Sequence, residues 1–170
     1  MQHLHWTKEG KMHLLKNGAD TLVMLNVNLL GNSTFAIGNH QYLVCKKGFW
    51  NPVVRVMLQD KTVLQLTHSL WTTKGQITYN DGTVYTKELS SKGGLKIRFV
   101  KNENEVLAYG IDYKNHRPFL TFSSSPATIE SENLLILSAL GMVLFAAIYS
   151  EVAGGDSDMT TFTQLTTFIS

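Results

Sequence analysis

Three groups of residues have side chains that could carry chemistry: histidines near the amino terminus, one cysteine, and lysines and arginines beside apolar residues. His3 and His5 stand two positions apart, which places both imidazoles on one face of a strand, and His13 follows nearby. Imidazole pairs can bind zinc or copper. No carboxylate or cysteine stands at ligand spacing, however, and no HExxH or CxxC motif occurs. We therefore expect strand histidines on the surface and no metal site.

The single cysteine, Cys45, lies in YLVCKKG beside two lysines, whose charge would activate an exposed thiol. The alternative is a strand cysteine that packs as a small apolar residue, and we favour it. The sequence has no GxSxG elbow, no GxGxxG or Walker loop and no recognisable pair of catalytic carboxylates. It therefore predicts no enzymatic activity and no cofactor. An enzyme whose site is assembled from distant residues stays open as an alternative.

The basic residues are the most informative polar residues. In LKIRFV, Lys96 and Arg98 share one strand face, opposite three apolar residues, and Lys101 follows at the turn. Cations gathered on an exposed face suit anionic lipid headgroups, whereas the simpler alternative is a solvated sheet face.

A second basic group, Lys46 and Lys47, precedes GFWNP, where Phe49 and Trp50 form an aromatic turn tip. Cations beside an exposed aromatic suit a membrane surface. The predicted ligand-binding residues are therefore Lys96, Arg98, Lys101, Lys46 and Lys47.

Charge is distributed unevenly along the chain. Residues 1–129 hold all fifteen Lys and Arg but eight of the acidic residues, which gives +7, whereas residues 130–170 hold five acids and no cation. A basic body can attract anionic lipid, nucleic acid or its own acidic tail. The charge is modest and no RNA-stacking signature occurs, so we expect no nucleic acid partner.

The elements that must position these residues are mainly strands. Turn residues recur about every ten positions between residues 2 and 122, and such spacing predicts an antiparallel meander. ITYNDGTVY is the strongest hairpin signal. About twelve candidate strands centre on residues 2–6, 12–15, 22–27, 35–37, 40–45, 53–57, 63–67, 76–79, 83–87, 95–100, 106–111 and 119–122.

The residue pattern changes after a linker at 123–133, in which Ser131 is a candidate helix N-cap. Residues 134–150 are apolar on every face and would form a helix of roughly 25 Å, against about 30 Å for a bilayer core. Both flanks are acidic and no Lys or Arg follows Arg117, which disfavours a membrane span. A helix enclosed by a barrel of about twelve strands must be apolar all round. A tail anchor remains the alternative.

Twelve short strands followed by NLLILSALGMVLFAAIYSE resemble the Tubby C-terminal-like fold, which is shared by Tubby proteins, LURP-one-related proteins and phospholipid scramblases. The resemblance covers residues 2–150 and implies a closed, mainly β barrel around a helix at about 133–149. In Tubby proteins a Lys-x-Arg pair on a strand helps to bind phosphoinositide, and LKIRF is similar in form, although it comes late in the strand order.

We therefore expect one domain over residues 1–150, followed by a polar tail at 151–170. Its expected function is non-enzymatic binding or scaffolding, with an anionic phospholipid or membrane surface as the partner. The amino terminus has no apolar signal region and the chain has a single cysteine, and both features indicate the cytoplasm. The expected membrane partner adds a location peripheral to a membrane. A tail-anchored protein with a cytosolic β domain is the alternative.

Overall fold

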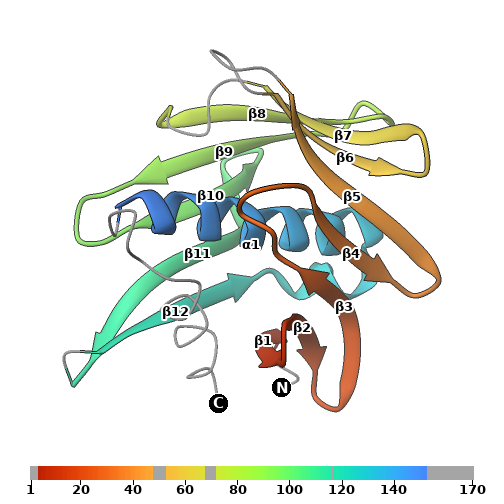
Figure 1. Ribbon diagram of the computed structural model, residues 1–170. Coiled ribbons are helices and arrows are strands. Elements are labelled where there is room, and N and C mark those ends of the chain that lie inside the picture. Colours follow the sequence, from red (N-terminus) through yellow and green to blue (C-terminus); the bar gives the residue numbers. More distant parts are fainter. Residues whose placement is uncertain (1–3, 48–52, 68–71, 116, 153–170) are drawn as a thin grey trace.

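The computed structural model describes residues 4–47, 53–67, 72–115 and 117–152. Twelve strands form one sheet in which each strand pairs antiparallel with the next along the chain (Figure 1). A short 3₁₀ helix, η1 (Pro126–Glu130), and one α-helix, α1 (Glu132–Val152), follow. The strands are β1 (Leu4–Glu9), β2 (Met12–Asn17), β3 (Asp20–Asn26), β4 (Ser33–Ile37), β5 (His40–Lys47), β6 (Val53–Leu58), β7 (Lys61–Thr67), β8 (Lys74–Tyr79), β9 (Val84–Ser90), β10 (Lys96–Lys101), β11 (Asn104–Lys114) and β12 (Arg117–Ser124).

Turn chemistry and alternation produce these strands, and the predicted meander is confirmed. In the turn between β8 and β9, Gly82 adopts a φ of 85°, and the Asp81 carboxylate accepts a hydrogen bond from the backbone N–H of Thr83 at 2.8 Å. Side chains then alternate, as in β10, where Ile97 and Phe99 are fully buried. The apolar residues of successive strands therefore cover one continuous inner face.

The sheet curls into a nearly closed barrel. The described residues of β1 and β12 meet, but no backbone ladder joins them. Side chains close this seam instead: the Trp6 indole on β1 contacts the Phe122 ring on β12 edge to face, with ring centroids 6.4 Å apart. Packing of the buried Trp6 against the partly buried Phe122 thus replaces the hydrogen bonds that would complete the barrel.

The apolar helix α1 lies inside this barrel, with strands on several sides of it (Figure 1). By length and composition alone Glu132–Ser150 could cross a membrane, but 78% of this apolar stretch is buried inside the structure. Ser131 precedes the helix, and its Oγ accepts a hydrogen bond from the backbone N–H of Leu134 at 3.4 Å. The predicted N-cap and the predicted buried helix are both confirmed.

An internal hydrogen-bonded chain ties the seam to the helix. The Trp6 indole N–H donates to the Tyr109 hydroxyl at 3.1 Å, and that hydroxyl donates to the backbone carbonyl of Ser138 on α1 at 2.7 Å. All three residues are fully buried. A buried polar group without a partner would cost folding free energy. This series of hydrogen bonds therefore fixes the position of the helix along the barrel axis.

Two more inward tyrosines hold the start of α1. The Tyr42 hydroxyl on β5 donates to the Glu132 carboxylate at 2.5 Å, and the Tyr79 hydroxyl on β8 donates to the backbone carbonyl of Asn133 at 2.6 Å. Because these strands lie at different places around the barrel, the two hydrogen bonds oppose both rotation and tilting of the helix.

Gly141 marks the closest approach of helix and wall. A Cβ atom at this position would lie 2.5 Å from Cε2 of Tyr109 and 2.9 Å from Cε2 of Phe99. Real Cβ atoms do not approach other atoms so closely, and both rings are fully buried and cannot move aside without opening the core.

We expect Gly141→Arg to prevent folding, because it adds both this overlap and a buried unpaired charge worth about 3–5 kcal/mol, against a typical total stability of about 5–15 kcal/mol. Ser150→Arg near the partly exposed end of α1 is the control and should fold. Circular dichroism and gel filtration measure both. A folded, monodisperse Gly141→Arg protein would contradict the enclosure of the helix.

Candidate functional site

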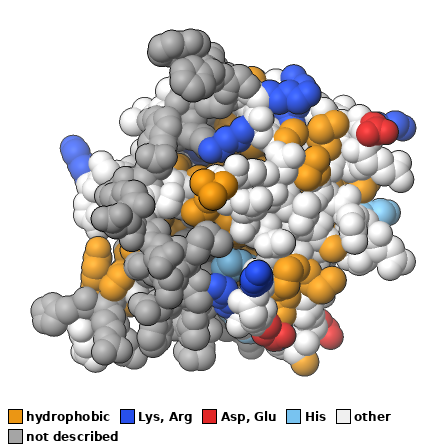
Figure 2. Space-filling view, in the orientation of Figure 1, with side chains coloured by type: hydrophobic (Ala, Val, Ile, Leu, Met, Phe, Trp, Pro, Cys, Tyr) orange, Lys and Arg blue, Asp and Glu red, His pale blue; other side chains and the backbone are white. Residues whose placement is uncertain are grey.

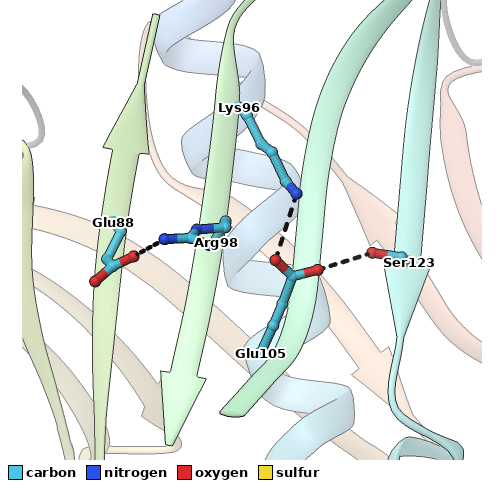
Figure 3. A network of polar contacts seen from close by, with 5 residues as sticks. All are labelled: Glu88, Lys96, Arg98, Glu105 and Ser123. Atoms are coloured by element: carbon cyan, nitrogen blue, oxygen red, sulfur yellow. Dashed lines mark hydrogen bonds and ion pairs between the residues drawn. The ribbon is translucent and has the colours of Figure 1, made fainter. Parts of the chain in front are cut away.

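The predicted pair Lys96 and Arg98 lies on the outer face of β10, as the alternation indicated. Figure 3 shows that neither cation is isolated there. Arg98 contacts the carboxylate of Glu88 on β9, and Lys96 lies 3.3 Å from a carboxylate oxygen of Glu105 on β11. The register places these residues on adjacent strands, so the pairing follows from strand order.

The network extends beyond these two pairs. Lys74 on β8 lies 3.8 Å from the Glu88 carboxylate, and the Ser123 hydroxyl on β12 lies 3.5 Å from the Glu105 carboxylate. Shallow depressions run between Lys74, Arg98 and Glu88 on this wall. An anion that binds here must therefore compete with two carboxylates for three cations.

The other predicted ligand residues lie elsewhere. Lys46 and Lys47 are exposed at the end of β5, which stands five places from β10 in the sheet. Lys101 ends β10, and its ammonium lies 5.3 Å from the centre of the Tyr85 ring. The five residues thus occupy three separate places. The aromatic tip at Phe49 and Trp50, like most of the predicted tail, lies outside the described residues.

The two ends of the barrel differ in charge. In an antiparallel meander successive connections lie at alternate ends, so the connections after odd-numbered strands share the end at which α1 finishes (Figure 1). Among the described residues this basic end carries Lys11, Lys46, Lys47, Lys74 and Lys92, against Glu9, Asp112 and Glu88, which lies opposite Lys74. The opposite, acidic end carries Asp20, Asp60, Asp81, Glu103 and Glu132, against Lys61 and Lys101, whereas the Lys16 ammonium lies 2.6 Å from Glu9.

On the face drawn in Figure 2, basic side chains gather where β5 ends, next to exposed apolar atoms. The sequence reveals a net charge but not this segregation, because the residues of each end are scattered along the chain. What the residues of one end share is a position in alternate turns. This can be recognised only when the strand order is known.

A polar cluster at the acidic end involves His40, Tyr42 and Glu132. One oxygen of Glu132 accepts from Tyr42 and lies 3.2 Å from Nδ1 of His40. The hydrogen bond from Tyr42, and then that from His40, lower the pKa of the Glu132 carboxyl, while burial and Glu132 raise the pKa of Tyr42. A carboxylate held in this way is a weak base, so the cluster secures the start of α1 rather than activating a nucleophile.

Lys87 was not singled out by the sequence, yet it is the most unusual charged residue of the structure. It points into the barrel, is fully buried, and donates to the backbone carbonyl of Thr72 at 3.0 Å. Burial lowers the pKa of Lys87 to about 8. Its inward direction could have been read from the alternation with Tyr85 on β9.

The prediction of surface histidines is wrong for His13, which is only 2% exposed. It alternates with the inward-facing Leu15 on β2, and so lies on the inner face. Burial, and then the charge of Lys8, lower the pKa of His13 to about 4. His3 lies outside the described residues, and no group of three or more potential metal ligands occurs in the part of the chain that the structure describes.

Cys45 is buried, with its Sγ 3.9 Å from the sulfur of Met57. This placement agrees with the interpretation of Cys45 as a packed strand residue.

Comparison of the chain with protein-family models, with curated proteins and with solved structures finds no match. The resemblance to Tubby-like barrels therefore stays a prediction, which rests on strand number, strand order and the C-terminal helix. What that likeness implies for function stays a prediction.

The buried His13 predicts a pH dependence of stability. Its folded-state pKa of about 4 lies below the ordinary value of 6.5, so the unfolded chain binds the proton more readily. Stability is then greatest above pH 6.5 and falls as the pH drops towards 4, by about 2 kcal/mol between pH 7 and 5.

Urea unfolding at both pH values measures this loss, and His13→Leu should remove most of the difference. An NMR titration in which the His13 imidazole protonates near its ordinary pKa would contradict the prediction.

Proposed function

We propose that this chain is a non-enzymatic, Tubby-like binding domain that docks on anionic membrane surfaces through the basic end of its barrel. The observation that carries the proposal is the segregation of charge between the two ends. A membrane surface that carries anionic lipid attracts the basic end and repels the acidic end, so the domain would bind in one orientation.

The expected electrostatic binding energies suit reversible binding. Each lysine near an anionic surface contributes about 1 kcal/mol, and this attraction is lost within a Debye length, which is about 8 Å at physiological salt. Lys46 and Lys47 are both exposed, and neither forms an ion pair with a carboxylate among the described residues. They should therefore contribute more than cations whose charge is already balanced.

Lys96 and Arg98 form a second candidate region for the same ligand chemistry. Their ion pairs with Glu105 and Glu88 are partly exposed at the sheet surface, and pairs at a surface are worth little in water. A headgroup phosphate could therefore displace the carboxylates, but the attraction it gains would be reduced by their remaining charge. We assign this wall a weaker, supporting role in the proposed binding.

The proposal includes no catalytic step. Cys45 is buried, and the Tyr42 and Glu132 side chains are engaged at the start of α1. These contacts support a binding role over an enzymatic one. We further propose a cytoplasmic location, where the anionic leaflet of cellular membranes would be accessible.

Co-sedimentation with phosphatidylcholine vesicles containing phosphatidylserine tests the docking. We expect Lys46→Ala/Lys47→Ala to weaken binding about tenfold to thirtyfold, since two cations are lost from the surface. Lys61→Ala/Lys101→Ala, at the acidic end, is the matched control and should bind like the wild type. Binding should fall steeply between 0.01 M and 1 M salt, as the Debye length shortens from about 30 Å to about 3 Å.

The outer wall is tested in the same assay. Lys96→Ala/Arg98→Ala should weaken binding less than the Lys46 and Lys47 pair does, and Glu88→Gln/Glu105→Gln should strengthen it. No wild-type binding at low salt, or equal binding by the Lys46→Ala/Lys47→Ala protein, would refute docking through the basic end.

A further inference from the structure

Leu30, in the connection between β3 and β4, has the most exposed large apolar side chain among the described residues. Its relative exposure is 102%, compared with 41% for Val84 at the acidic end. A single exposed leucine is ordinary on a protein surface. Its significance here depends on how its loop is held and on what lies beside it.

The loop is fixed by its own polar side chains. Asn28 Oδ1 accepts from the backbone N–H of Leu30 at 3.1 Å, and Ser33 Oγ accepts from the backbone N–H of Asn28 at 2.9 Å. Ser33 is only 1% exposed, so this anchor is built into the barrel wall. Leu29 packs against the core, while its neighbour Leu30 is left in solvent.

The loop lies at the basic end. It borders a small gap that is also lined by Lys46 of β5 and by Val143 and Ala147 in the second half of α1. Lys47 is exposed next to Lys46. The apolar tip therefore has cations on the neighbouring strand end, while Glu132 and Asp81 lie at the other end of the barrel, where α1 begins.

We propose that Leu30 inserts into the headgroup and acyl boundary of an anionic bilayer while Lys46 and Lys47 remain at the level of the lipid phosphates. This inference rests on the proposed docking function and deepens it by naming the inserted residue. A preformed tip loses little conformational entropy on insertion, because its backbone is already fixed.

A bilayer fits this surface better than a protein partner does. A stable protein interface buries about 800 Å² on each side, far more than one leucine supplies. Interfacial insertion needs only a short apolar projection, about 5–10 Å deep, together with basic residues around it. The charge of the basic end complements an anionic lipid surface in the same way.

The experiment compares Leu30→Ser with Val84→Ser, which removes an exposed apolar side chain from the acidic end. The full chain is sedimented with vesicles of phosphatidylcholine and phosphatidylserine. Leu30→Ser should bind about tenfold to hundredfold more weakly, the range expected for burying a leucine. Leu30→Met should bind like the wild type, and Val84→Ser should be unaffected.

The depth of insertion into the bilayer is measured with Leu30→Cys or Val84→Cys in the Cys45→Ala protein, each labelled with an environment-sensitive dye. The dye at position 30 should brighten on binding and be quenched by spin-labelled acyl chains, whereas the dye at position 84 should not respond. The acidic-end label controls for nonspecific dye partitioning.

The outcomes separate the two proposals. If the wild type binds no vesicles, the docking function fails and the insertion fails with it. If the wild type binds but Leu30→Ser binds equally and the dye at position 30 is not quenched, the insertion alone is refuted. Self-association without lipid that Leu30→Ser abolishes would assign the loop to a second copy of the chain, and would equally overturn the inference.

Discussion

Enclosure of α1 is the constraint on which the structure depends. A helix that is apolar on every side must be covered on every side, and a curled sheet of twelve strands would leave an empty lumen without it. Sheet and helix therefore supply each other's core. The hydrogen bonds of Tyr109, Tyr42 and Tyr79 to the helix then fix its position inside a surface that would otherwise allow sliding.

This enclosure decides where function can be. The inner face is filled by the helix, and several polar side chains that look reactive in isolation are occupied there. Lys87 bonds a backbone carbonyl, and His13 is buried in its neutral form. On the outer face of β5, the Cys45 thiol is packed against Met57. Binding is left to the outer wall and to the two ends, where the side chains meet solvent.

The outer wall and the basic end differ in available charge. On the wall, Lys96 and Arg98 lie across from glutamates of the adjacent strands, so the field of each cation is partly cancelled. At the basic end Lys46, with Lys47 next to it, instead lies near the loop that carries Leu30. A surface that combines unbalanced cations with a projecting apolar side chain suits an anionic interface better than a wall of paired charges does.

The sequence by itself determined the local elements. Turn residues such as Asp81 and Gly82 set the strand boundaries, alternation set which face of β10 is buried, and all-round apolarity marked α1 as an enclosed helix. These features follow from interactions within about ten residues, which is why they can be read along one chain.

Only the tertiary structure decided the partners. Glu88 and Glu105 neutralise Arg98 and Lys96 because strand register brings them together, and His13 is buried because β2 turns that face toward the helix. The lysines at residues 46 and 47 separate from those at 96 and 101 because the sheet places β5 and β10 on different parts of the barrel. Such contacts join residues far apart in the chain, so their existence depends on closure of the barrel and not on any local pattern.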